Sequence, residues 1–493
     1  MATIVGNNNN NPPPPLNGGN ADDRIFGLGG NDTANGGNGN DRIFGDIQQN
    51  GSFPPNPGAD VLNGNNGDDT LQGDRSGPGG TQDTLNGGNG ADTIIWNNGD
   101  GSDLVNGGNG NDTQVVNGAT RPAGLIDDDF TVRETGRNAV FDRINLVPFT
   151  LTLDNVEVLR VNGLDGNDRL RILEDLARSD LNRVEFNGGA GNDTLDGDGT
   201  TTRITASGGD GIDSLTGGSA ADLLNGDSGN DVLTGGRSAA GTRDSVNGGN
   251  GNDTIIWNNG DGSDFVNGGN DRDTQVVNGA TGQGDNFEVR GLANGNVDFD
   301  RVNLVPFELN LNNVERLVVN GGGGDDRLTI RNSLAGTDLQ SIVFSGGTGR
   351  DTLIGDGTFR PILANGGDDR DTLAGGNGND TLNGDGGDDQ LSGGAGNDVL
   401  DGGLGRDLLS GGGGSDIFRY NSTGDSPAAG IARDVILAFG DSTGNQDHID
   451  LSAIDANAGG GGDPQFVFIG NAAFTAAGQV RVVNQGGGFS LVE

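Results

Sequence analysis

Large apolar residues recur at every ninth position in the clearest part of this chain, residues 366–419. This part reads GGDDRDTLA, GGNGNDTLN, GDGGDDQLS, GGAGNDVLD, GGLGRDLLS and GGGGSDIFR. An amphipathic helix needs apolar residues three and four apart, and a half-buried strand needs them at every second position, so neither explains the spacing. One apolar residue in nine buries little surface unless many copies stack. The pattern therefore predicts a solenoid in which each nonapeptide forms a six-residue turn and a three-residue strand.

Each nonapeptide also has an acid at its sixth place and a large apolar residue at its eighth place. The acids are Asp371, Asp380, Asp389, Asp398, Asp407 and Asp416, and the apolar residues are Leu373, Leu382, Leu391, Leu400, Leu409 and Phe418. If consecutive turns alternate between two edges of a flattened spiral, acids eighteen residues apart stack above one another. Stacked carboxylates repel, and Ca²⁺ relieves that repulsion because it accepts about six to eight oxygen ligands. We therefore predict a calcium-binding parallel β-roll, and a flexible glycine-rich linker would not keep these positions in phase.

The repeat extends over most of the chain and is overlaid by a longer duplication. It begins at Gly18 and is interrupted by insertions, of which residues 46–58 are the first. NGGNGADTIIW at Asn86 recurs as NGGNGNDTIIW at Asn247, and FDRINLVPF at Phe141 recurs as FDRVNLVPF at Phe299. The chain is thus a tandem of two units of about 160 residues within a longer array, which predicts an elongated solenoid with contacts between neighbouring repeats.

One segment of each unit departs from the nonapeptide. Apolar and polar residues alternate in Phe149–Leu153 and in Phe307–Leu311, which predicts half-buried strands. We interpret these segments as wider rungs with a thicker apolar core, and a separate globular insert is the alternative. The predicted organisation is a disordered tail (1–17), β-roll blocks (18–117, 188–279 and 346–419), strand-rich segments (118–187 and 280–345) and a C-terminal β cap with the secretion region (420–493).

The amino-acid composition indicates that folding depends on a bound cation. The 493 residues carry a net charge of −43, only 31% are hydrophobic and 99 are glycine. A chain with so little apolar content and so high a charge does not fold through apolar burial alone. Metal binding can supply the missing free energy, so we expect an unfolded metal-free state and a folded calcium state.

The same composition disfavours several classes of partner and of activity. Cysteine is absent, which excludes disulfides, and so acidic a chain disfavours a nucleic-acid partner. The sequence contains no run of eighteen apolar residues, so we expect no membrane span. The first residues do not resemble a Sec-type signal peptide. His448 is the only histidine, too few for a zinc hydrolase site, and no G-x-S-x-G motif is present, so we expect no enzyme.

The nonapeptides resemble those of the RTX (hemolysin-type) family of secreted bacterial proteins. The C-terminal segment resembles the cap of serralysin-type metalloproteases. The matching stretches are Asp416-Ile-Phe-Arg-Tyr420, Asp434-Val-Ile-Leu-Ala-Phe439, Asp447-His-Ile-Asp-Leu451, Phe468-Ile-Gly-Asn-Ala-Ala-Phe474 and Gly478-Gln-Val-Arg481. The resemblance implies export through a type I secretion exporter with an uncleaved C-terminal signal, and folding outside the cell, where calcium is abundant.

The resemblance also implies that the acid of each GGxGxD turn is a calcium ligand, with many ions bound and roughly one per turn. These acids are Asp23, Asp32, Asp41, Asp60, Asp69, Asp92, Asp112, Asp193, Asp213, Asp222, Asp231, Asp253, Asp273, Asp351, Asp371, Asp380, Asp389, Asp398, Asp407 and Asp416. Asp22, Asp83, Asp168, Asp244 and Asp326 match the turn less closely.

The predicted function follows from repeats that occupy nearly the whole chain. We expect a secreted bacterial protein that folds on calcium and has a structural or self-assembling role at the cell surface or in an extracellular matrix, sheath or filament. Its expected partners are further copies of itself and the exporter. The alternative is a polysaccharide-binding or adhesin-like module, which the tandem and the paired Trp96 and Trp257 motivate. Those tryptophans could stack on sugar rings, although packing at a widened turn is favoured.

Overall fold

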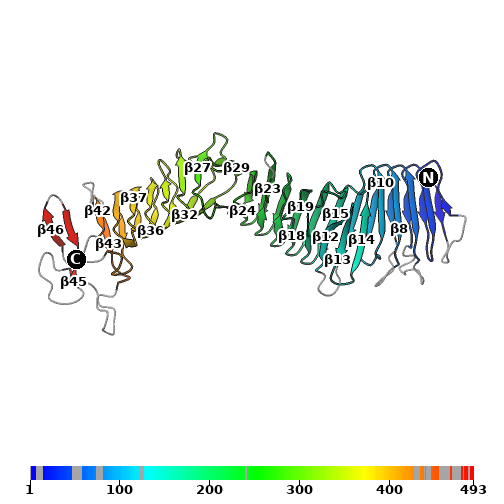
Figure 1. Cartoon of the computed structure of the whole chain (residues 1–493), viewed down its shortest axis with the longest axis horizontal. Helices are drawn as coiled ribbons and strands as arrows, with labels where there is room; N and C mark the ends of the chain where they lie inside the picture. Colours follow the sequence, from blue (N-terminus) through cyan, green and yellow to red (C-terminus); the bar gives the residue numbers. More distant parts are fainter. Residues whose placement is uncertain are drawn as a thin grey trace, which may run out of the picture. The chain divides into compact units, whose positions relative to one another are not determined.

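The computed structural model describes residues 2–6, 15–46, 58–73, 81–120, 127–238, 241–426, 433–437, 439, 446–454, 467–468, 479–480, 482–486 and 489–492. These residues form strands and turns, and no helix occurs among them. Two compact units contain them, residues 1–275 with 308–314 and residues 276–307 with 315–493 (Figure 1). The predicted all-β class and the parallel β-solenoid are confirmed.

In the first unit the chain passes alternately through two sheets whose strands run parallel, apart from one antiparallel insertion. In spatial order, the first sheet contains β1 (Thr3–Val5), β3 (Arg24–Phe26), β5 (Arg42–Phe44), β7 (Thr70–Gln72), β9 (Thr93–Asn97), β11 (Thr113–Asn117), β15 (Val158–Asp165), β17 (Arg183–Ala190), β19 (Arg203–Asp210), β21 (Leu223–Ser228), β23 (Arg243–Asn250), β25 (Ser263–Asn270) and β29 (Phe307–Asn312). The second sheet contains β2 (Leu16–Asn17), β4 (Thr33–Asn38), β6 (Val61–Asn66), β8 (Thr84–Asn89), β10 (Leu104–Asn109), β14 (Phe149–Asp154), β13 (Asn138–Arg143), β12 (Asp129–Thr135), β16 (Arg169–Ile172), β18 (Thr194–Asp196), β20 (Ser214–Thr216), β22 (Val232–Thr234) and β24 (Thr254–Asn258).

The second unit repeats this construction, and β26 (Thr274–Asn278) precedes it. One sheet contains β28 (Val297–Arg301), β27 (Asn286–Gly291), β31 (Arg327–Arg331), β33 (Thr352–Ile354), β35 (Thr372–Gly376), β37 (Gln390–Ala395), β40 (Leu408–Gly413) and β42 (Val435–Leu437). The other contains β30 (Arg316–Gly323), β32 (Ser341–Thr348), β34 (Ile362–Asp368), β36 (Thr381–Gly387), β38 (Val399–Asp401), β39 (Leu404–Gly405), β41 (Ile417–Arg419) and β43 (His448–Asp450). The short pairs β44 (Val467–Phe468) with β45 (Gln479–Val480) and β46 (Val482–Gly486) with β47 (Phe489–Val492) follow.

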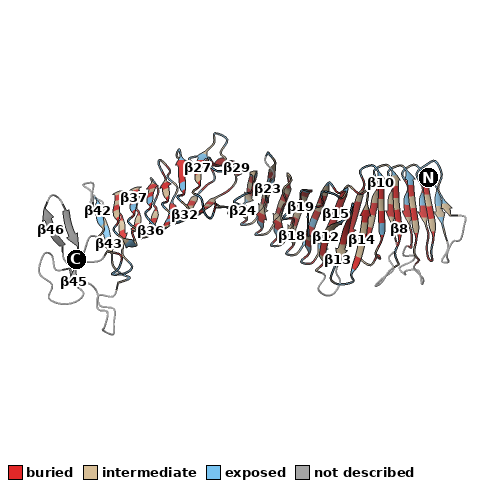
Figure 2. Ribbon diagram, in the orientation of Figure 1, coloured by how far each residue is buried: buried red, intermediate tan, exposed pale blue. Residues whose placement is uncertain are grey.

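The core between the two sheets is thin because each nonapeptide strand contributes one large apolar side chain. Leu382 and Leu400 pair in register on β36 and β38, and both are fully buried. Their neighbours along the strand face outward, so that buried and partly exposed residues alternate (Figure 2). This is the period of two that a strand requires, confined to three residues per turn.

The turns require glycine for two reasons. Gly90 has a φ of +137°, which side-chain-bearing residues rarely adopt. A Cβ on Gly90 would also lie 1.9 Å from the carbonyl oxygen of Gly67 in the preceding rung. Both constraints follow from stacking turns at the spacing of neighbouring strands, about 4.8 Å.

Asparagine side chains tie neighbouring rungs together on the outer surface. The side-chain amide of Asn35 donates to Asn17 at 2.8 Å, that of Asn63 to Asn35 at 2.9 Å, and that of Asn86 to Asn63 at 2.8 Å. Such ladders stabilise in-register parallel stacking, because each amide both donates and accepts.

The strand-rich segments are antiparallel insertions within a sheet. In the first unit, β13 lies between β12 and β14 and runs antiparallel to both, while β14 pairs with β10 and β12 pairs with β16. The half-buried strands predicted at Phe149–Leu153 and Phe307–Leu311 are confirmed as β14 and β29. The first insertion thickens the core, because Phe141 packs between Phe130 and Phe149 with ring centroids 5.2 and 5.9 Å away.

Both tryptophans are part of the core. Trp96 and Trp257 are each 1% exposed, and their indole N–H groups donate to the carbonyl oxygens of Gly101 and Gly262. The ring of Trp96 stacks on Phe149 with centroids 3.7 Å apart. The preferred interpretation as packed aromatics is confirmed, and neither ring is available to stack on a sugar.

The two ends of the chain compare differently with their predictions. The segment 1–17, expected to be disordered, contains β1 and β2, which pair with β3 and β4. At the C-terminal end, Asp416–Tyr420 continues the stack, and β43 within the Asp447–Leu451 motif pairs with β41. The cap motifs at 468–474 and 478–481 lie for the most part outside the described residues.

Candidate calcium-binding turns

The turn acids stack along the edges of the solenoid through a backbone hydrogen-bond ladder. In residues 366–419, the N–H of Asp371 donates to Oδ1 of Asp389, and the N–H of Asp389 donates to Oδ1 of Asp407, each at 2.8 Å. On the opposite edge the N–H of Asp380 donates to Oδ1 of Asp398 at 2.8 Å. The predicted alternation of acids between two edges, with eighteen residues per full rung, is thus confirmed here.

The ladder also survives the insertions. The N–H of Asp41 donates to Oδ1 of Asp69, 28 residues later, at 2.7 Å. The next steps, to Asp92 and to Asp112, span 23 and 20 residues. The insertions therefore do not shift the register of the carboxylates.

The second carboxylate oxygen, Oδ2, points into a cradle beside the first glycine of its own turn. A Cβ on Gly64 would lie 2.3 Å from Oδ2 of Asp69 and 2.4 Å from the carbonyl oxygen of Gly87 in the next rung. A Cβ on Gly87 would likewise lie 2.3 Å from Oδ2 of Asp92 and 2.4 Å from the carbonyl oxygen of Gly107. Each cradle is therefore lined by oxygen atoms from two successive rungs.

Within the described residues, many of these Oδ2 atoms are buried and accept no hydrogen bond. They belong to Asp41, Asp69, Asp92, Asp112, Asp168, Asp193, Asp213, Asp231, Asp253, Asp326, Asp351, Asp371, Asp380, Asp389, Asp398 and Asp407. A buried carboxylate oxygen without a partner is costly. Carboxylate and carbonyl oxygens are the ligands that Ca²⁺ prefers, so the residues present fit this ion. Bound calcium would supply positive charge between successive rungs.

The electrostatics of the row are unfavourable without a cation. Burial is the main cause that raises the pKa of Asp92 to about 7, and the stacked Asp69 and Asp112 add to it by repulsion. Burial likewise raises the pKa of Asp168 to about 8 and that of Asp371 to about 7. Near neutral pH these carboxyls must therefore bind protons or a metal ion for the fold to be stable.

All twenty predicted ligands lie in the ladders, and none is more than 5% exposed. Asp83, Asp168, Asp244 and Asp326, which match the turn less closely, also occupy ladder positions. Asp22 is exposed and lies outside the acid row. That the ladder acids bind calcium remains a prediction.

Several ladder acids were not predicted as ligands because their turns lack part or all of the GGxG half of the motif. Asp103, Asp128, Asp264, Asp285 and Asp434 all occupy such positions. Each has an apolar residue two places later, which lies within the adjoining strand, and this D-x-apolar triplet is the signal that could have found them.

A further acid, Asp46, was also missed because it stands where the first insertion begins. Asp32, Asp46 and Asp60 are buried, and one oxygen from each lies within 4.8 Å of the others. The N–H of Gly58, on the other side of the insertion, donates to Asp46 at 2.7 Å. Asp46 thus lies beside two stacked turn acids and links the described residues on either side of the insertion.

Comparison with known families agrees with this geometry. A family model described as the RTX calcium-binding nonapeptide repeat matches residues 17–50, 56–76, 79–95, 98–114, 185–200, 207–256 and 365–425. These segments are RTX calcium-binding repeats. RTX-repeat proteins are typically secreted by bacteria, and their β-rolls typically have structural or binding roles. No curated protein matches the chain. Within the described residues, no helix is long and apolar enough to cross a membrane.

The Asp389→Asn substitution is expected to weaken calcium-dependent folding locally. It removes one anionic oxygen from the cradle beside Gly384 while it keeps the ladder acceptor Oδ1. We expect the calcium concentration that protects the amides of β37 from hydrogen exchange to rise by roughly tenfold, the equivalent of about 1.4 kcal/mol. The exposed neighbour Asp388, changed to Asn, is the matched control. Equal midpoints for the two variants would remove Asp389 from the ligand set.

The metal-free protein is expected to be more stable in mild acid than at neutral pH. Because burial raises the pKa of turn acids such as Asp92 and Asp371 to about 7, the folded state binds more protons than the unfolded state between pH ~4 and ~7. Its stability therefore falls as pH rises through that window. Circular dichroism in EDTA should show more β-structure and a higher melting temperature at pH 5 than at pH 8. Saturating calcium should abolish this order, because binding needs ionised carboxylates. A pH-independent signal in EDTA would contradict the argument.

Proposed function

We propose that this protein is a secreted, calcium-stabilised β-solenoid with a structural or self-assembling role at the cell surface or in the extracellular matrix. The observation that carries this proposal is the row of buried carboxylates along the edges of both units. Extracellular calcium-binding modules bind at roughly 10⁻⁴–10⁻³ M, a concentration that the cytosol does not reach. Such a chain would therefore stay unfolded for export through a type I exporter and fold outside the cell.

A structural role is supported by what the rungs present on their outer surface. In the first unit, Val5, Phe26 and Phe44 are aligned in register on the outer face of β1, β3 and β5. The rings of Phe26 and Phe44 stack with centroids 5.2 Å apart, and Val5 is 52% exposed. An apolar column on a sheet face favours lateral contact with another copy, once calcium has offset the charge of −43 that keeps copies apart.

Light scattering during a calcium titration from an EDTA-stripped start tests this proposal. We expect the radius to contract at constant mass and the mass then to rise, with both changes reversed by EDTA. Phe26→Ser combined with Phe44→Ser should suppress the rise in mass and keep the contraction, whereas the exposed Phe359 changed to Ser should not. A calcium form that stays monomeric at all concentrations would remove the assembly role.

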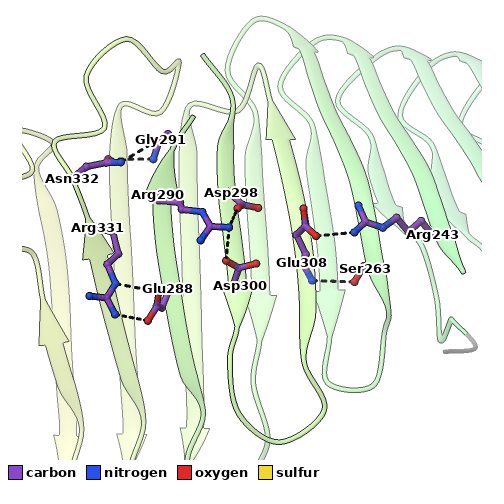
Figure 3. A network of polar contacts seen from close by, with 10 residues as sticks. All are labelled: Arg243, Ser263, Glu288, Arg290, Gly291, Asp298, Asp300, Glu308, Arg331 and Asn332. Atoms are coloured by element: carbon purple, nitrogen blue, oxygen red, sulfur yellow. Dashed lines mark hydrogen bonds and ion pairs between the residues drawn. The ribbon is translucent and has the colours of Figure 1, made fainter. Parts of the chain in front are cut away.

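A second candidate function, polysaccharide binding, is favoured by a different surface of the first unit. Phe265 is 51% exposed, and the guanidinium of Arg243 lies 5.1 Å from its ring centroid. Arg243 is held by an ion pair with Glu308 at 2.7 Å, and the N–H of Glu308 donates to Ser263 Oγ (Figure 3). An exposed ring beside fixed polar groups is suited to the apolar face of a sugar.

An open polar trough lies beside this ring. Asn267 faces outward two residues after Phe265, and its side-chain amide donates to Asn247 on the neighbouring strand at 2.7 Å. Asn270 donates to Asn250 in the same way. The lining is completed by Asp227, Gly249, Gly269 and Asn313. Carboxamides offer donors and acceptors to sugar hydroxyls, and they repeat here at the spacing of strands, about 4.8 Å.

Affinity electrophoresis of the calcium form through gels containing bacterial polysaccharides tests this candidate. Phe265→Ala should reduce retardation by roughly tenfold in apparent affinity, the equivalent of about 1.4 kcal/mol. Phe359→Ala, which removes an exposed ring from the second unit, is the control and should leave retardation unchanged. Unaltered retardation of the Phe265 variant, or no retardation of the native protein by any polysaccharide in the panel, would count against this surface.

A further inference from the structure

Two of the turn acids lie beside a buried arginine. Asp128 lies in the acid ladder, where its N–H donates to Oδ1 of Asp168 at 2.6 Å. A Cβ on Gly118 would lie 2.6 Å from its Oδ2 and 2.6 Å from the carbonyl oxygen of Gly163. Asp128 thus donates to the ladder, and its Oδ2 lies in the same kind of cradle, as in the acids that fit calcium.

Asp285 stands at the corresponding place in the second unit. Its N–H donates to Oδ1 of Asp326 at 2.6 Å, and a Cβ on Gly279 would lie 2.6 Å from its Oδ2. Like Asp128, it is fully buried.

Arg143 and Arg301 are the fully buried arginines among the described residues, and each lies beside one of these two carboxylates. Arg143 Nη1 lies 3.1 Å from Oδ1 of Asp128, and Arg301 Nη1 lies 3.2 Å from Oδ1 of Asp285. Oδ2 of Asp128 also accepts the N–H of Ala119 at 2.7 Å. Each turn therefore already contains a cation that neutralises its acid.

The hairpins hold these arginines in place. Arg143 is the last residue of β13, its side chain is 1% exposed, and Nε and Nη2 donate to the carbonyl oxygen of Val147 at 3.0 and 2.8 Å. Its guanidinium lies 5.1 Å from the ring centroid of Trp96 and 5.2 Å from that of Phe149. The donors of the guanidinium are thus largely satisfied, as a buried charge requires.

Arg301, the last residue of β28, repeats these contacts in the second unit. It donates to the carbonyl oxygen of Val305 at 2.9 and 2.7 Å and lies over the ring of Phe307 at 5.2 Å. Arg290 on β27 forms ion pairs with Asp298 and Asp300 on β28, and these pairs also connect the two strands of this hairpin (Figure 3). The same arrangement has therefore been kept in both copies of the tandem.

We propose that Arg143 and Arg301 take the place of a metal ion in these two turns, so that the rungs around them fold without calcium. In each unit the antiparallel hairpin and the strand beside it, β12–β14 with β16 and β27–β28 with β31, would form a folded island. The hairpins supply the apolar burial that a nonapeptide rung lacks, with Phe130, Phe141 and Phe149 in the first. Their contacts are also local in sequence, which favours fast formation.

Such islands would change how the solenoid forms. In a linear array, each rung gains most of its stability from its neighbours, so the first rung is the least favourable to form. A rung that needs no calcium provides an open strand edge on which the adjacent nonapeptides can stack as the ion becomes available. Folding would then spread outward from one starting point in each unit.

Hydrogen exchange of the full-length protein in EDTA tests this proposal. Peptides covering 129–172 and 286–331 should exchange at least about tenfold more slowly than peptides covering 381–419. Calcium should then protect 381–419. Equal exchange of all three regions in EDTA would overturn the inference, whereas a failure of calcium to protect 381–419 would instead count against the proposed function.

Substitutions assign the effect to the arginines. Arg143→Met should abolish the protection of 129–172 in EDTA and leave that of 286–331 intact, and Arg301→Met should do the reverse. The unaffected island is the internal control in each variant. Arg133→Met, which breaks the partly exposed pair with Asp142 on the same hairpin, should leave both islands protected. Loss of both islands in either single variant, or of neither, would contradict the proposal.

Discussion

The repulsion and burial of stacked carboxylates are the constraint on which this fold depends. Parallel in-register stacking places identical residues directly above one another, so that any acid at a turn becomes a row of acids. The ladder from each backbone N–H to the next Oδ1 fixes the row but satisfies only one oxygen of each carboxylate. In many of the described turns the other oxygen lies in a cradle of carbonyl groups and accepts no hydrogen bond, so a bound cation would become part of the core.

The thin apolar core follows from the same constraint. With about one large apolar side chain per nonapeptide strand between the sheets, apolar burial per rung is small, and most of the remaining residues form the turns. Glycine is needed where a carbonyl of the preceding rung approaches, as at Gly90, and glycine adds nothing to the core while it increases the entropy of the unfolded chain. A low apolar content and a charge of −43 are therefore consequences of a cation-dependent turn, rather than independent properties of the chain.

The parts of the fold and of the candidate site that could be predicted from the sequence are those whose contacts repeat with the sequence period. The phase of Asp371, Asp389 and Asp407 could be read from spacing alone, because parallel stacking converts sequence period directly into contact. The pairing of Asp128 with Arg143 could not, since it depends on a hairpin whose antiparallel register places the arginine beside the turn. The burial of Trp96 against Phe149 has the same origin. The alternation of apolar and polar residues predicted the strands of the antiparallel insertion, but it did not predict which strands they would pair with.

The two kinds of turn represent two solutions to one electrostatic problem. An arginine carried on the chain neutralises one acid at a fixed position, but a buried guanidinium needs a hairpin to supply its remaining acceptors, as the carbonyl oxygen of Val147 does. A calcium ion needs only oxygens that stacking already provides, so it can serve every rung without inserted residues. The ion is therefore suited to a long array and the arginine to isolated points within it. A chain that combines them remains responsive to calcium along most of its length, while it keeps one metal-independent position in each copy of the tandem.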